Sequence, residues 1–256
     1  MSAVRAFSGL PARRGWDRVD RGAHRQRGVS LGVVAAMLIV VGALTVLGNA
    51  LHRMRAERAQ SVATAERLEM VVRGLTDFAI LHKRLPCPAP GGGRAGREAR
   101  VDGGCDDQSG GVVPWRTIAI AETTARDRWG HAFSYRVADS LTVETSLLNP
   151  NGDDTLILCL DPACSERRHD PEVGTGAAFV VIGHGEHAPG SFIADSGQRF
   201  AGQSSGAEKA NMSAKGPFID GPPSRRGEPA DSVNYFDDTL RAVSIAELQS
   251  VVTKGR

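Results

Sequence analysis

The chain has 256 residues and a net charge of +2, so it is long enough for one modest domain with appended segments. The charge is uneven, because residues 1–28 hold seven arginines and two aspartates, a net +5 that leaves −3 on the remainder. A basic arm of this kind could contact nucleic-acid phosphates. Here it runs directly into an apolar segment, which favours a membrane leader and argues against a nucleic-acid partner.

An uncharged segment extends from Val29 to Leu51. A helix gains about 1.5 Å per residue, so a segment of this length would cover a hydrocarbon core of about 30 Å. The denser basic cluster lies on the N-terminal side, at Arg25 and Arg27. We therefore predict a single membrane span with the N-terminus in the cytoplasm and the rest of the chain on the other side.

Two other interpretations of this segment stay open. A buried core helix is disfavoured, because no charge interrupts so long an apolar run. A cleaved secretory signal would use the small residues Gly48, Asn49 and Ala50 as its cleavage site. The apolar part of such a signal is usually about 7–15 residues long, which is shorter than this segment.

Residues 52–84 continue with the pattern of an amphipathic helix. Apolar side chains recur mostly at steps of three and four residues, at Leu51, Met54, Val62, Leu68, Val71, Leu75, Phe78 and Leu81. Pro86 and Pro88 end the pattern, because proline lacks an N–H and disfavours helix in the residue before it. The sequence thus predicts one helix from Val29 to Arg84, whose second half needs a partner or a following domain to cover its apolar stripe.

Residues 85–256 are expected to form a β-rich head. Residues 86–112 are rich in turn formers and charges, which predicts a loop. Short runs of β-branched and aromatic residues predict strands at 112–121, 132–137, 141–148, 155–160 and 177–183. The turn formers at 150–153 predict a hairpin between the third and fourth of these runs.

The C-terminal part of the head begins with residues 184–232, where glycine, serine and charges predict a long, partly mobile excursion. Residues 232–238 are expected to add a strand. Ser244 and Glu247 form a capping box ahead of an apolar run, which predicts a short terminal helix. Together these elements predict an α+β fold, in which a long N-terminal helix packs on a small antiparallel sheet.

All four cysteines lie beyond the apolar segment, at Cys87, Cys105, Cys159 and Cys164. An even number outside the cytoplasm indicates disulfides, and we predict the pairs Cys87–Cys105 and Cys159–Cys164. A zinc site is the alternative. It is disfavoured because the spacing lacks a Cys-x-x-Cys knuckle and an oxidising compartment disfavours free thiolates.

Metal-binding patterns are weak. His184 and His187 together with Asp195 are conceivable ligands, but histidines in a glycine-rich loop are more often solvated or packed. Residues 149–154 mimic part of a calcium loop without its closing glutamate, so a plain turn is the simpler interpretation. We predict no bound metal and no cofactor.

Catalytic patterns are also weak. Residues 202–206 lack the strand that a nucleophile elbow requires, and residues 91–96 lack the Lys-Ser/Thr of a P-loop. Trp115 and Trp129 are first interpreted as packing residues, with ligand stacking as the alternative. The sequence therefore predicts no catalytic residue and a protein that is not an enzyme.

An ordered set of segments resembles the type IV pilin and type II secretion pseudopilin superfamily. They are Arg27-Gly28-Val29-Ser30-Leu31, "HKRLPCPAP" (82–90), "VPWRTIAI" (113–120), "DRWGHAFSYRV" (127–137), "AAFVVIGHG" (177–185) and "YFDDTL" (235–240). The resemblance implies that a membrane prepilin peptidase cuts between Gly28 and Val29. It also implies an anchor in bacterial inner-membrane lipid, a periplasmic head, and other pilin-like subunits as partners.

Two positions depart from the pattern of that superfamily. An aromatic residue usually opens the mature chain and a glutamate is usually fifth, whereas this chain has Val29 and Val33. The glutamate is thought to pair with the amino terminus of a neighbouring subunit, and a buried carboxylate is costly unless it is paired. A minor or tip subunit could dispense with this pairing, so the departure at Val33 favours a minor subunit.

Two other functions stay open at this point. The chain could be a membrane-anchored periplasmic hydrolase that uses the loop of His184 and His187. It could also be an anchored ligand-binding module, for which the apolar helix is only a tether.

Overall fold

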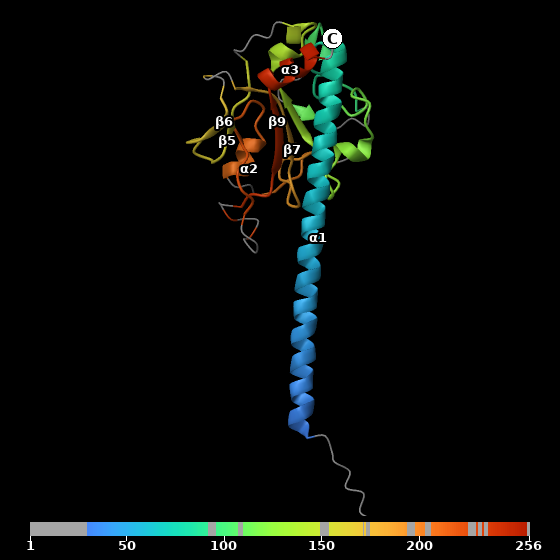
Figure 1. Cartoon of the computed structure of the whole chain (residues 1–256), viewed down its shortest axis with the longest axis vertical. Coiled ribbons are helices and arrows are strands. Elements are labelled where there is room, and N and C mark those ends of the chain that lie inside the picture. Colours follow the sequence, from blue (N-terminus) through green and yellow to red (C-terminus); the bar gives the residue numbers. More distant parts are fainter. Residues whose placement is uncertain are drawn as a thin grey trace, which may run out of the picture. The chain divides into compact units, whose positions relative to one another are not determined.

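The computed structural model describes residues 30–91, 96–106, 110–148, 154–170, 172, 175–193, 198–202, 206–224, 229, 232 and 235–254. It divides into two compact units, Met1–His52 and Arg53–Arg256, which are described separately (Figure 1). The expected processing site, Gly28 and Val29, lies outside the described residues.

Helix α1 spans Leu31–His82 and is, among the described residues, long and apolar enough to cross a membrane by length and composition. Its residues in the first unit are all exposed, as expected of a surface without protein partners. The helix ends two residues before the predicted Arg84, because Lys83 adopts a left-handed backbone conformation with φ of 56°. The predicted stop at the prolines is therefore wrong by a small margin.

The part of α1 in the second unit buries one face. Leu68, Val71, Leu75 and Phe78 lie in the main hydrophobic core, as the three- and four-residue spacing predicts. Val62 and Leu81 belong to the same predicted stripe, but they are exposed. The stripe is therefore narrower than the sequence pattern suggests.

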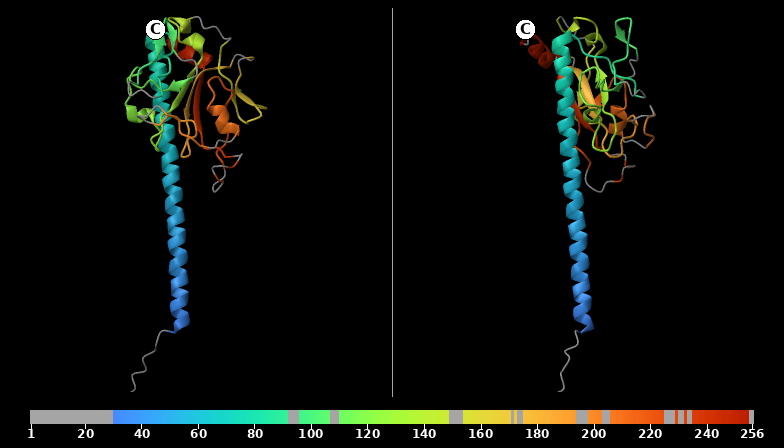
Figure 2. Two further views of the ribbon diagram at one scale, coloured as in Figure 1. Left: turned by 180° about the vertical axis from the view of Figure 1, so that it is seen from behind. Right: turned by 90° about the vertical axis from the view of Figure 1, so that its right-hand side faces the viewer.

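The main sheet has four antiparallel strands in the order β3-β4-β7-β9. Their bounds are Gly111–Val112 for β3, Ser134–Val137 for β4, Ala177–Gly183 for β7 and Thr239–Ser244 for β9. Strands β7 and β9 lie side by side through most of their length (Figure 1). In the views of Figure 2, the C-terminal half of α1 runs along one face of this sheet.

The other face of the main sheet packs against a second core. A three-stranded sheet in the order β6-β5-β8 contributes to it, with β6 at Arg167–His169, β5 at Leu158–Cys159 and β8 at Phe218–Ile219. Strands β5 and β8 are parallel, so this sheet is not the purely antiparallel one that we predicted. Helix α2, Gly206–Asn211, also contacts β8. Since both faces of β7 are covered, all seven of its residues are buried.

Two strand predictions and the predicted hairpin are wrong. In 112–121 only the first residue is in a strand, because turns begin at Trp115 and the short helix Glu122–Ala125 follows. Residues 141–148 form 3₁₀ turns at Asp139–Leu141 and Ser146–Leu148. Their backbone is satisfied by the segment after α1, since Leu85 donates to Leu141 and Leu147 donates to Lys83 at 2.8 and 3.0 Å. The predicted hairpin does not form, because β5 pairs with β6 and β8 instead.

The described part of residues 184–232 is more ordered than predicted, because it contains α2 and β8. The described residues of 232–238 are not in a strand, and β9 begins only at Thr239. Helix α3, Ile245–Lys254, follows as the capping box predicts. Ser244 Oγ accepts the Glu247 amide at 3.2 Å, and Glu247 Oε2 accepts the Ser244 amide at 2.9 Å.

Both expected disulfides are present. Cys87 is joined to Cys105 with Cα atoms 5.3 Å apart, and Cys159 to Cys164 with Cα atoms 4.9 Å apart. The first closes a loop that contains the small hairpin of β1, Arg100–Val101, and β2, Gly104–Cys105. The second closes the turn between β5 and β6. The zinc alternative therefore has no free thiolate among these cysteines.

Candidate functional site

Three histidines of the head each lie beside a carboxylate. His131 Nδ1 lies 3.2 Å from Asp127, His184 Nδ1 lies 3.5 Å from Asp238, and His187 Nδ1 lies 3.5 Å from Asp237. The sheet explains why they gather. The start of β4, the end of β7 and the start of β9 lie next to one another at the same end of the sheet, because these neighbouring strands are antiparallel.

Asp127 organises the turn that precedes β4. Its Oδ1 accepts the amides of Trp129 and His131 at 2.9 and 2.8 Å, while its Oδ2 faces His131. The hydrogen bond with this carboxylate raises the pKa of His131, although burial acts in the opposite direction. Arg67 of α1 donates to the carbonyls of Arg126 and Asp127 at 3.0 and 2.8 Å, which ties the turn to the helix.

Ser134, His184 and Asp238 form a relay in which Ser134 is hydrogen-bonded to His184, whereas His184 Nδ1 lies 3.5 Å from Asp238 without a hydrogen bond. The Ser134 hydroxyl lies 2.8 Å from His184 Nε2, and Asn211 donates to Asp238 at 2.7 Å. This is the order of groups in a serine hydrolase. Ser134 is 0% and His184 2% exposed, however, and a nucleophile must reach its substrate. In this conformation the relay joins four segments of the fold and has no access for a substrate.

His187, Tyr235 and Asp237 form a hydrogen-bonded chain at the same end of the sheet. Tyr235 donates to Asp237 at 3.0 Å, and its oxygen lies 2.6 Å from His187 Nδ1. Asp237 also accepts the amides of Glu186 and His187 at 3.0 and 3.4 Å. Burial, together with the neighbouring charge of Asp238, raises the pKa of the Asp237 carboxyl. Burial likewise raises the pKa of Tyr235 well above its ordinary value.

The two histidines considered as conceivable metal ligands do not come together. His184 and His187 belong to separate pairs, and Asp195 lies outside the described residues. Across the described ranges, no group of three or more histidine, cysteine, aspartate or glutamate side chains could hold a metal ion. Of the partial calcium loop only Asp154 is described, and its carboxylate accepts the Ser140 amide at 3.2 Å.

Sequence reasoning found His184 and His187 but missed their carboxylate partners. Asp238 and Ser134 lie 54 and 50 positions from His184, and no local spacing links them. The motif segments "DRWGH", "IGHG" and "YFDD" carry most of the cluster. All three segments belong to the set of motifs that resembles the pilin-like head. That shared membership was the signal that could have suggested that they lie in one folded unit.

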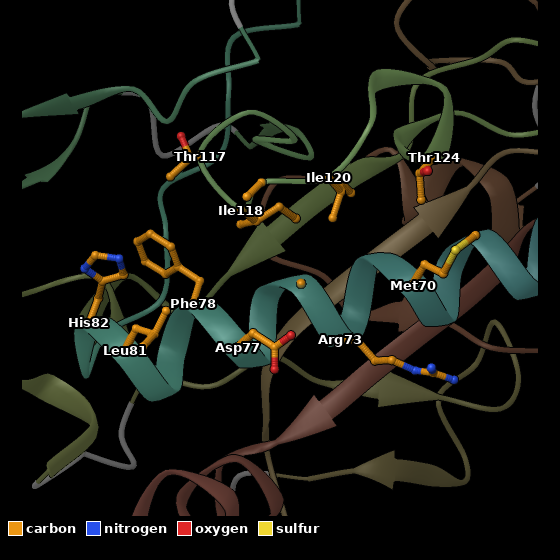
Figure 3. Close-up of a pocket in the computed structure, with 12 residues that line it drawn as sticks. Met70, Arg73, Asp77, Phe78, Leu81, His82, Thr117, Ile118, Ile120 and Thr124 are labelled. Carbon is orange, nitrogen blue, oxygen red and sulfur yellow. The ribbon is translucent and has the colours of Figure 1, made fainter. Parts of the chain in front are cut away.

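A second candidate surface lies along α1. Met70 and Leu81 are 44% and 76% exposed, and between them the helix lines a pocket of about 610 Å³ (Figure 3). The loop at 117–124 forms the opposite wall. Gly74 allows this wall to approach closely, because an added Cβ would lie only 3.1 Å from Ile120 and 3.3 Å from Ile118. The pocket therefore joins the exposed helix face to the "PWRT" segment.

The "RLPCP" segment is held at the end of α1 by an ion pair. Arg84 and Glu98 make two hydrogen bonds of 2.8 Å, and Glu98 also accepts the Cys87 amide at 3.0 Å. Trp115 packs against the main core, with the Arg116 guanidinium 4.8 Å above its ring.

Comparisons with protein-family models, with curated proteins and with solved structures found no match to this chain.

Proposed function

We propose that this chain is a non-enzymatic, pilin-like minor subunit of a type IV pilus or a type II secretion-type assembly. Its apolar helix would anchor it in the bacterial inner membrane, with the N-terminus cytoplasmic and the head periplasmic. A prepilin peptidase would cut between Gly28 and Val29. Assembly would follow when the helix leaves the bilayer and packs against the helices of other pilin-like subunits.

The observation that carries this proposal is that α1 contributes both to the apolar segment and to the core of the head. One helix supplies an uncharged segment long enough for a bilayer and, beyond it, the central core residues Leu68, Val71 and Leu75 of the head. A simple tether needs no such sharing, because a flexible linker would serve it equally well. The sharing supports a subunit in which the helix and the head act together.

The exposed face of α1 supports the same proposal. Val62, Met70 and Leu81 leave apolar surface on the helix, beside charged Arg73 and Asp77. Burying these side chains against another subunit would be favourable at about 25 cal/mol per Å² of apolar area. The head would then determine which partner binds.

The first experiment is the mass of the N-terminus of the membrane-extracted protein. Cleavage by a prepilin peptidase gives a chain that begins at Val29, and replacing Gly28 by aspartate should leave Met1 in place. The variant Gly22→Asp is the matched control, because it makes the same change at a leader glycine that lies outside both the proposed site and the apolar segment. A wild-type chain that begins at Leu51, or one that keeps Met1, would contradict the proposal.

The second experiment replaces residues 29–51 by an unrelated membrane span of equal length. Cysteine cross-links from the exposed face of α1 to other pilin-like subunits should disappear, while the head stays folded and membrane-bound. Cross-linking that survives the exchange would assign residues 29–51 to a tether and reject their role in assembly.

A hydrolase is the second candidate function, and the order of Ser134, His184 and Asp238 favours it. An enzyme of this kind would lose turnover of ester or amide substrates on Ser134→Ala. A joint substitution of His184 and His187 would have the same result. An assembly subunit should keep its cross-links in Ser134→Ala, and the two functions are thereby separated.

A further inference from the structure

A chain of polar contacts links three segments of the head at the end of the sheet where the histidines gather. His131 Nδ1 lies 3.2 Å from Asp127 and 3.1 Å from the carbonyl of Gly185. The amide that follows Gly185, that of Glu186, donates to Asp237, which also accepts the Tyr235 hydroxyl. We call Asp127, His131, Gly185, His187, Tyr235 and Asp237 the histidine clasp.

The clasp fixes the protons on two rings. His131 Nδ1 faces two acceptors, so this nitrogen carries the proton. Tyr235 has one hydroxyl proton and gives it to Asp237, so His187 Nδ1 must donate to the Tyr235 oxygen. The His131 ring therefore keeps Nε2 for a second proton, and its cationic form would face the Asp127 carboxylate.

The geometry points to a proton-responsive clasp: mild acid holds the 183–187 turn against the 127–131 turn and the 235–238 segment, and higher pH loosens them. Through Arg67, which binds the carbonyls of Arg126 and Asp127, the clasp also fastens this end of the sheet to α1. The inference concerns the head alone, so its failure would leave the proposed assembly function unaffected.

The surroundings of the clasp favour the cationic form of the His131 ring. The charged and titratable groups that face it from the packed elements are Arg67 on α1, Asp127, Glu186, Glu208 on α2, Asp237, and the neighbouring pair His184 and Asp238. Carboxylates outnumber cations in this set. The aromatic ring of Phe200, 5.9 Å from that of His131, adds no competing charge.

The direction of the pH effect follows from His131, whose pKa is raised in the folded protein. Such a group stabilises the folded form fully below the unfolded value of about 6.5. The stabilisation is lost as pH rises through the higher folded value. The 183–187 turn should therefore be tightest near pH 6 and should open more often at about pH 8.5.

Hydrogen exchange on the full-length, detergent-solubilised protein tests the inference. Protection of the Glu186 and His187 amides, corrected for the intrinsic rate at each pH, should be lower at pH 8.5 than at pH 6 by roughly threefold or more. The α3 amides should not change in this way. Protection that is equal at the two pH values would overturn the inference.

Variants connect the effect to His131. In His131→Asn the amide nitrogen replaces Nδ1 but does not titrate, so the pH dependence should vanish. The variant His169→Asn is the matched control, since His169 also contacts a backbone carbonyl, that of Thr175 at 2.8 Å, away from the clasp. If His131→Asn does not fold, Asp127→Asn keeps the turn-forming oxygen and should also flatten the profile. A dependence that persists in a folded variant would reject the clasp.

Discussion

Arg84 and Glu98 face each other with two parallel hydrogen bonds of 2.8 Å, one from each terminal nitrogen of the guanidinium. The side chains are only 9% and 16% exposed. Glu98 also accepts the Cys87 amide, so one carboxylate joins the end of α1 to the loop closed by Cys87 and Cys105. Fork-to-fork pairs of this kind are the strongest ion pairs in proteins, because both partners are oriented.

Replacing Glu98 by glutamine should destabilise the head by about 3 kcal/mol, because the mostly buried Arg84 guanidinium keeps only the exposed Glu144, 3.2 Å from its Nε, as a counter-charge. Chemical denaturation of the full-length protein in detergent measures this loss. Glu69→Gln is the matched control, since Glu69 pairs with Arg241 at 2.6 Å on the surface, and such pairs contribute about 0–1 kcal/mol. Equal losses in both variants would show that the Arg84 pair has no special weight.

The same ion pair should make the stability of the head depend on pH in the acid range. Burial alone would raise the pKa of Glu98, but the hydrogen bonds from Arg84 and the Cys87 amide outweigh it and lower the pKa. A carboxyl with a lowered folded pKa contributes stability above its unfolded value, and this contribution is lost as pH falls through the folded value. Thermal unfolding of the wild type should therefore show a drop in stability below about pH 4.5 that Glu98→Gln lacks in part.

The two disulfides should differ in the stability that they confer. They join cysteines 18 and 5 positions apart, and a longer closed loop restricts the unfolded chain more. Serine substitution of both cysteines should cost about 3 kcal/mol for Cys87–Cys105 and about 2 kcal/mol for Cys159–Cys164. Denaturant midpoints of the two double variants measure the difference. A larger loss for Cys159–Cys164 would show that β5 and β6 depend on their covalent link.

The elements that the sequence predicts well are those whose pattern reports burial directly. The run 177–183 is continuously apolar, and β7 is indeed covered on both faces. The spacing of Leu68, Val71 and Leu75 likewise reports a single buried helix face. The capping box and the two disulfides each join residues that are close in the sequence. Local sequence is therefore sufficient to predict them.

The elements that the sequence misses depend on distant partners. Residues 141–148 have strand composition, but Leu141 and Leu147 reach the core from 3₁₀ turns that hydrogen-bond to the segment after α1. Strand β9 has only partly buried residues at four of its six positions, because it lies at the edge of the sheet. The histidine–carboxylate pairs form only when β4, β7 and β9 are side by side, and no spacing within one segment predicts that.

Two leucines of α1 separate packing from assembly. Leu75 is buried in the main core, whereas Leu81 is 76% exposed at the pocket beside the helix. Leu75→Ala should lower the free energy of unfolding by about 2–5 kcal/mol, because it leaves a cavity. Leu81→Ala should change it by about 0.5 kcal/mol or less, as is usual for exposed sites.

The assembly role predicts the opposite order in a binding measurement. Leu81→Glu places a charge on the exposed face of α1, and burying an unpaired charge against a partner is costly. Cross-linking of the membrane-bound protein to other pilin-like subunits should therefore fall in Leu81→Glu while the head keeps its wild-type unfolding midpoint. Asp102→Lys, at an exposed turn between β1 and β2, serves as a charge-changing control away from this face. If Leu81→Glu cross-links as well as the wild type does, the exposed face of α1 is not the surface through which the subunit assembles.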